Sequence, residues 1–120
     1  PPLAGGPWAA VYDSSWPRGH RRVFYTVDGI TRLPGRHTID FVKLDVQGRT
    51  TRAGADADLV ASSLGHGAEV LAVADAVVAT VRNDMTEPAR VSAGVKHPQD
   101  AAAGNYLSLD LGNGRYAVYE

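Results

Sequence analysis

Apolar residues that alternate along residues 67–81 constrain the fold of this chain more than any other feature. Successive side chains of an extended strand point to opposite faces, so this alternation is typical of β-structure. In the first half of the segment both faces are apolar, and they carry Val70, Leu71, Ala72, Val73 and Ala74. The sequence therefore predicts a hairpin with arms at residues 69–74 and 77–81, buried on both sides.

Further strands are indicated where β-branched and aromatic residues run into turn residues. The predicted strands are residues 8–12, 21–28, 38–46, 106–111 and 115–119. Asp28-Gly29 favours a tight turn at the end of the second strand. Gly112-Asn113-Gly114 favours a hairpin turn between the last two, because glycine and asparagine tolerate positive φ.

The regions between these strands are predicted to be loops. Residues 1–18 form an extended lead-in that contains the first short strand, and residues 19–120 form one β domain. Residues 50–64 are expected to be a loop with at most a short helix, and residues 83–103 a long surface excursion. The expected fold class is all-β, an antiparallel β-sheet domain with long loops.

Composition excludes several classes of function. The chain has 120 residues, a formal net charge of −1 and no cysteine. A charge this small attracts no nucleic acid, and the lack of cysteine excludes disulfides and thiolate metal sites. No apolar run reaches the roughly 20 residues of a membrane-spanning helix, so no membrane span is expected. Residues 1–7 also lack the pattern of a signal peptide.

Two segments resemble those of a known family. Residues 67–78 read G-x-x-V-x-A-V-A-D-x-V-V, and residues 104–119 resemble the hairpin that follows. Both are similar to the central sheet of zinc metallopeptidases of the M23 (lysostaphin/LytM-like) family. The resemblance implies that family's fold, a zinc cofactor, and hydrolysis of peptidoglycan or other Gly-rich peptides. It also implies an extracytoplasmic or secreted location.

The resemblance further implies a metal pair, a His and an Asp four residues later at the start of a strand. Asp40 matches the Asp, but Arg36 stands at the His position. His37 lies three residues before Asp40, which places the two side chains on opposite faces unless a β-bulge intervenes. Asp40 and His37 are the metal candidates. The plainer alternatives are that Asp40 caps a turn or pairs with an arginine, and that His37 faces solvent on an edge.

Three residues are candidates to line a cleft beside that pair, namely His20, Arg36 and His66. His20 lies just before a strand, within reach of the same cleft, and is otherwise a surface residue. His66 lies between two glycines that permit close approach of a ligand, and is otherwise a turn residue. No catalytic residue is assigned, because the family's His-Leu segment and His-x-His strand would follow Glu120.

The expected function is that of an M23-like zinc metalloendopeptidase domain, truncated or degenerate, inactive alone and binding zinc weakly or not at all. Expected partners are peptidoglycan or peptide. The last predicted strand leaves an open edge, so self-association or binding of a complementary C-terminal fragment is also expected. The alternative is a non-catalytic β-domain that binds a cell-wall polymer or a partner protein. Whether the chain is an enzyme stays open at this point.

Overall fold

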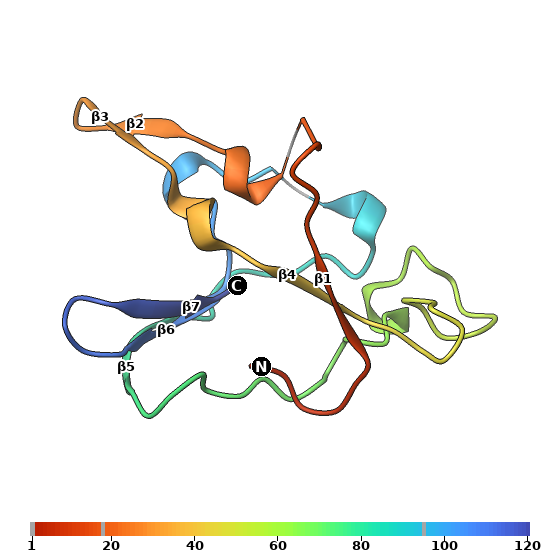
Figure 1. Cartoon of the computed structure of the whole chain (residues 1–120). Coiled ribbons are helices and arrows are strands. Elements are labelled where there is room, and N and C mark those ends of the chain that lie inside the picture. Colours follow the sequence, from red (N-terminus) through yellow and green to blue (C-terminus); the bar gives the residue numbers. More distant parts are fainter. Residues whose placement is uncertain (1, 18, 95) are drawn as a thin grey trace.

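The computed structural model describes residues 2–17, 19–94 and 96–120. Within them, short strands form three separate antiparallel sheets with the orders β1-β4, β2-β3 and β5-β6-β7 (Figure 1). The strands are β1 (Trp8–Val11), β2 (Tyr25–Val27), β3 (Ile30–Arg32), β4 (Asp40–Lys43), β5 (Val77–Arg82), β6 (Tyr106–Asp110) and β7 (Tyr116–Tyr119). The β1–β4 ladder crosses the middle of the molecule, and the β2–β3 hairpin projects from it.

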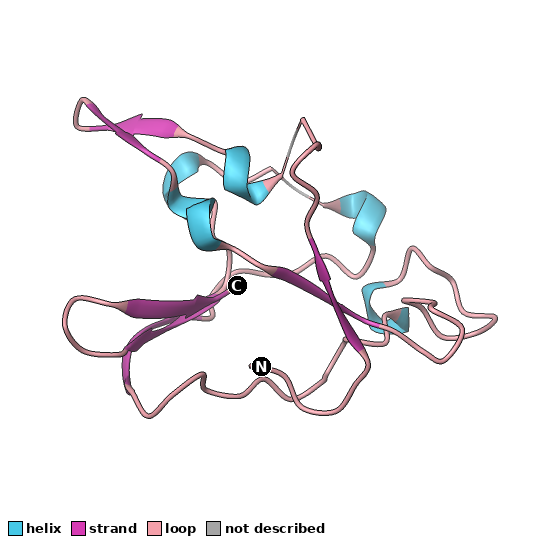
Figure 2. Cartoon of the chain, in the orientation of Figure 1, coloured by secondary structure: helices cyan, strands magenta, loops and turns pink. Residues whose placement is uncertain are grey.

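The helical elements are single 3₁₀ turns of three or four residues (Figure 2). They are η1 (His20–Arg22), η2 (Pro34–His37), η3 (Val60–Ser62), η4 (Val91–Ala93) and η5 (Gln99–Ala101). The all-β prediction with antiparallel sheets is therefore confirmed. In the part of the chain that is described, no helix has the length and apolar character needed to cross a bilayer.

The two predicted turns form as expected, because their residues accept left-handed backbone angles. Asp28 and Gly29 have φ values of 49° and 75° and join β2 to β3, which matches a two-residue hairpin turn with both central φ angles positive. Gly112, Asn113 and Gly114 have φ values of 80°, 56° and 70° and join β6 to β7. Local turn chemistry thus fixes both hairpins.

The strand predicted at residues 8–12 is confirmed as β1, and it pairs with β4 so that Trp8 lies opposite Lys43 and Val11 opposite Asp40. The predictions for 21–28 and 38–46 were too long. Residues 21 and 22 belong to the 3₁₀ turn η1, so β2 begins only at Tyr25. Residues 38 and 39 follow the 3₁₀ turn η2, so β4 begins only at Asp40. Asp40 consequently stands where the chain passes from η2 into a strand.

The hairpin predicted for residues 69–74 and 77–81 is wrong. β5 pairs with β6 instead, and the 69–74 segment bonds to the start of the chain: the Leu71 N–H donates to Pro2 O (2.8 Å) and the Ala4 N–H to Glu69 O (3.1 Å). The physical reason lies in the link Asp75-Ala76. It offers neither the glycine nor the asparagine that the tight turns in this chain use.

The predicted burial of that segment on both sides is also wrong. Val77 is 73% exposed, and all residues from 70 to 81 are exposed. Among the described residues, Leu109 in β6 is the one hydrophobic side chain that is buried, at 6% exposure. The chain exposes 9054 Å², against about 6,200 Å² for a compact monomer of this size. Its radius of gyration is 15.9 Å, against about 14 Å expected.

The described residues of the 50–64 and 83–103 loops are mostly exposed, and the two loops are joined to one another. Leu59 and Arg90 form an isolated β-bridge, and the Val91 N–H donates to Asp58 O (2.8 Å). The Asp58 carboxylate also accepts hydrogen bonds from the Ser92 N–H and hydroxyl, both at 2.8 Å, and from Arg90 Nη1 at 3.0 Å. Side-chain acceptors on one loop therefore hold the other in place.

We expect Leu109→Ala to destabilise the fold by about 2–4 kcal/mol, because it empties the one buried apolar site among the described residues. Leu33→Ala is the matched control. The same truncation on an exposed side chain should cost no more than about 0.5 kcal/mol. Urea unfolding followed by circular dichroism measures both. Equal losses for the two variants would contradict the assignment of the core to β6.

We expect the contact between the two loops to weaken in acid. Hydrogen bonds from the Ser92 backbone and hydroxyl, and then from Arg90, hold the pKa of Asp58 below its ordinary value of 3.8. A depressed folded-state pKa gives stability that is present above pH 3.8 and is lost as the pH falls through the lower folded-state value. Amide exchange of Ser92, followed by NMR, should accelerate over that window. Asp58→Asn should abolish this acid dependence.

Candidate functional site

The structure brings His20 and Asp40 together from different elements. His20 is the first residue of η1 and Asp40 the first of β4, and His20 Nδ1 lies 2.8 Å from Asp40 Oδ1. An imidazole and a carboxylate are the ligand types that zinc takes from proteins without cysteine. The pair is therefore the candidate metal centre, and we refer to it as the His20–Asp40 pair.

Close packing of η1 against η2 positions the pair. A side chain on Gly35 would collide with the His20 carbonyl oxygen and would lie 2.8 Å from its carbonyl carbon. Glycine therefore permits a backbone approach at η2 that other residues prevent. Arg21 adds a second link, because its Nε donates to Thr38 O (2.6 Å) while its guanidinium lies 4.2 Å from the centroid of the Tyr12 ring.

The pair is open to solvent. The side chain of His20 is 65% exposed and that of Asp40 is 48% exposed. A contact between side chains this exposed contributes only about 0–1 kcal/mol to stability. Nε2 of His20 makes no hydrogen bond to any described residue. The pair thus has one imidazole nitrogen and one face that another group can approach.

The other metal candidate does not join this pair. His37 is the last residue of η2, it is exposed, and no hydrogen bond or ion pair within the described residues links it to Asp40. The β-bulge that would turn His37 toward Asp40 does not form, because His37 belongs to η2 and the β1–β4 ladder begins only at Asp40. The residue that meets Asp40 is His20, from the set of cleft candidates.

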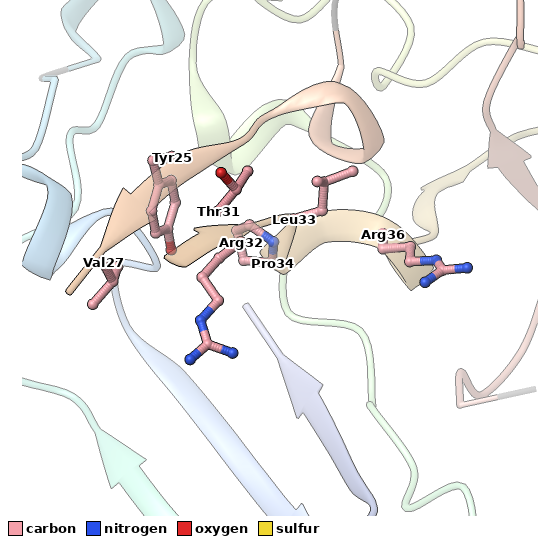
Figure 3. Close-up of a pocket in the computed structure, with 7 residues that line it drawn as sticks. All are labelled: Tyr25, Val27, Thr31, Arg32, Leu33, Pro34 and Arg36. Carbon is pink, nitrogen blue, oxygen red and sulfur yellow. The ribbon is translucent and has the colours of Figure 1, made fainter. Parts of the chain in front are cut away.

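The remaining cleft candidates lie elsewhere. His66 is exposed in the turn that follows η3, where its N–H donates to Ser63 O (3.2 Å). Arg36 lines an open groove of about 680 Å³ between η2 and the β2–β3 hairpin, with Tyr25 and Arg32 on its strands (Figure 3). The Arg32 and Arg36 side chains extend in different directions, so they do not converge on one ligand atom.

This site brings together two side chains of the types that bind metal ions, a histidine and an aspartate. Within the described ranges, no group of three or more His, Cys, Asp or Glu side chains is arranged to hold a metal ion. Zinc in a catalytic centre takes three protein ligands and keeps one open position. The His20–Asp40 pair therefore supplies at most two of the ligands of such a centre.

The sequence predicts His20 near the cleft but does not pair it with Asp40. The two residues are 20 positions apart, and a spacing rule based on one strand relates only nearby residues. The local sequence signal for this contact is Gly35, since a glycine beside proline at residue 34 permits a tight backbone approach. That signal does not identify which other segment of the backbone packs against Gly35.

Comparison with models of known protein families, with curated proteins and with solved structures gives no match.

We expect Gly35→Ala to separate His20 from Asp40, because the added methyl group forces the His20 backbone away from η2. Overpacking of this kind costs about 1–3 kcal/mol. Gly65→Ala is the control, since a Cβ there makes an ordinary 3.5 Å contact with the Trp8 ring. Imidazole ¹⁵N shifts of His20 should change in Gly35→Ala and not in Gly65→Ala. Unchanged shifts in both would contradict the packing argument.

Proposed function

We propose that this chain is an M23-like zinc metalloendopeptidase domain in which His20 and Asp40 supply two of the metal ligands. The observation that carries the proposal is the 2.8 Å approach of His20 Nδ1 to Asp40 Oδ1 at the start of β4. The residues named by the resemblance included Asp40 at a strand start, and β4 begins at that residue. His20 takes the ligand position that the sequence predicts for His37.

The donor set of the pair fits zinc. A neutral imidazole nitrogen and a carboxylate oxygen bind Zn²⁺ at about 2.0–2.2 Å, which places two ligands of a tetrahedral ion about 3.3 Å apart. The observed 2.8 Å is a hydrogen-bond distance, so a small opening of an exposed pair admits the ion. Neither side chain has to leave a buried position to do this.

In this proposal the chain's own residues hold the metal ion and fix the orientation of its ligands. Zinc, when bound, supplies Lewis acidity toward a peptide carbonyl and a nucleophilic water near neutral pH. Asp40 is fixed by the β1–β4 ladder, and His20 by η1 with the Arg21 link to Thr38. Two ligands give low affinity, so we infer that the chain alone holds zinc weakly and does not hydrolyse peptide at a useful rate.

The substrate class follows from the family resemblance and is peptidoglycan or another Gly-rich peptide. A flexible glycine-rich strand suits an open, exposed site, since it needs no deep side-chain pocket. The proposal includes an extracytoplasmic site of action, because that is where such a polymer lies.

Zinc titration tests the proposal directly. Calorimetry should show weak binding to the wild-type chain, and His20→Ala and Asp40→Asn should each lower the affinity by about tenfold or more. His37→Ala is the matched control and should leave the affinity unchanged, since no hydrogen bond or ion pair among the described residues links His37 to the pair. An equal loss in all three variants, or no zinc binding in the wild type, would reject the His20–Asp40 centre.

A second candidate function has its own observation. The described residues expose an unusually large surface and contain no group of three metal-binding side chains. These features favour a non-catalytic β-domain that binds a cell-wall polymer or a partner protein. Sedimentation of the chain with purified peptidoglycan separates the two. Binding that persists in His20→Ala with excess chelator favours the binding domain.

A further inference from the structure

The outer edge of β5 is free in the described residues. β5 pairs on one side with β6, and no backbone hydrogen bond links its other side to another described segment. Its residues Val77 to Val81 are exposed and uncharged, and none of them is proline or lysine. Such an edge is a template for pairing with a further strand, because it offers unpaired N–H and C=O groups beside apolar side chains.

The exposed area is large enough for a stable interface. The chain exposes 9054 Å², about 2,800 Å² more than a compact monomer of its size. A standard protein interface takes only about 800 Å² from each partner. A dimer that buries the β5 edge and its neighbouring valines would therefore cover only part of the extra surface that this chain exposes.

Charge placement favours a second copy of this chain as the occupant. Asp75 precedes β5, and Arg82 ends it. When two β5 strands pair antiparallel with Asp75 opposite Arg82 of the second copy, Val77 lies opposite Thr80 of that copy. Two-fold symmetry repeats each of these pairs. Opposite charges directly across an antiparallel pair are stabilising.

The side-chain faces match in this register. Val77, Thr80 and Arg82 lie opposite Asp110, Ser108 and Tyr106 of β6, so all three are on one face of the sheet. The irregularity between Val78 and Thr80 is what places Val77 and Thr80 on the same face. Arg82 Nε donates to Asp84 Oδ1 (3.0 Å), and its Nη groups make no hydrogen bond to a described residue. They are available to Asp75 of the second copy.

We propose that this chain forms a two-fold symmetric homodimer in which the outer edges of β5 pair antiparallel and extend the sheet to six strands. This interface is separate from the His20–Asp40 pair and does not depend on the proposed metal centre.

Sedimentation velocity across a wide concentration range tests the proposal. The wild type should show a reversible monomer–dimer equilibrium. Asp75→Arg and Arg82→Asp should each raise the dimer dissociation constant by about tenfold, because like charges then face each other twice. The double variant should return the constant close to the wild-type value. Failure of the double variant to restore dimerisation would overturn the proposed register.

A second pair of variants keeps the test independent of charge. Val77→Lys on β5 should weaken the dimer, whereas Val118→Lys on β7 should not, since both valines are exposed but lie at opposite edges of the same sheet. Circular dichroism confirms that each variant is folded. A strictly monomeric wild type, or a dimer weakened by Val118→Lys and not by Val77→Lys, would overturn the proposal.

Discussion

Strand β6 lies between β5 and β7 and carries Leu109, the one apolar side chain that the described residues bury. Most of the other large hydrophobic residues remain partly or largely exposed, including the valines of β5. Backbone pairing and turn geometry therefore hold this architecture more than apolar burial does. In the absence of an extensive core, the sheets stay small and separate, and the surface is larger than that of a compact domain.

Backbone contacts, more than apolar burial, also position the candidate site. Its residues are positioned by short backbone approaches, such as η1 against Gly35, and by one guanidinium bond from Arg21 to Thr38. None of these contacts encloses the His20–Asp40 pair, so the side chains stay accessible. A pair of this kind can accept an ion or a further ligand without unfolding its surroundings.

Turn residues account for what could be predicted about the fold. Asp28-Gly29 and Gly112-Asn113-Gly114 adopt the positive φ angles that their residue types favour, and both hairpins form where expected. The prediction of a hairpin over residues 69–74 and 77–81 failed because it depended on apolar alternation and not on turn residues. Apolar alternation shows that a segment is extended, but it does not identify the partner strand. Here residues 69–74 form no strand. They bond to the start of the chain through Pro2 and Ala4, with one isolated bridge between Leu3 and Val70, and they bend at 73–75.

The sequence by itself determined the all-β class, the two tight turns and the residue types available for a metal. It could do so because these properties depend on neighbours along the chain. Only the tertiary structure decided that His20, and not His37, meets Asp40, since their proximity comes from two 3₁₀ turns packing across Gly35. The tertiary structure also decided that β5 lies at a sheet edge, because strand order depends on contacts between distant segments.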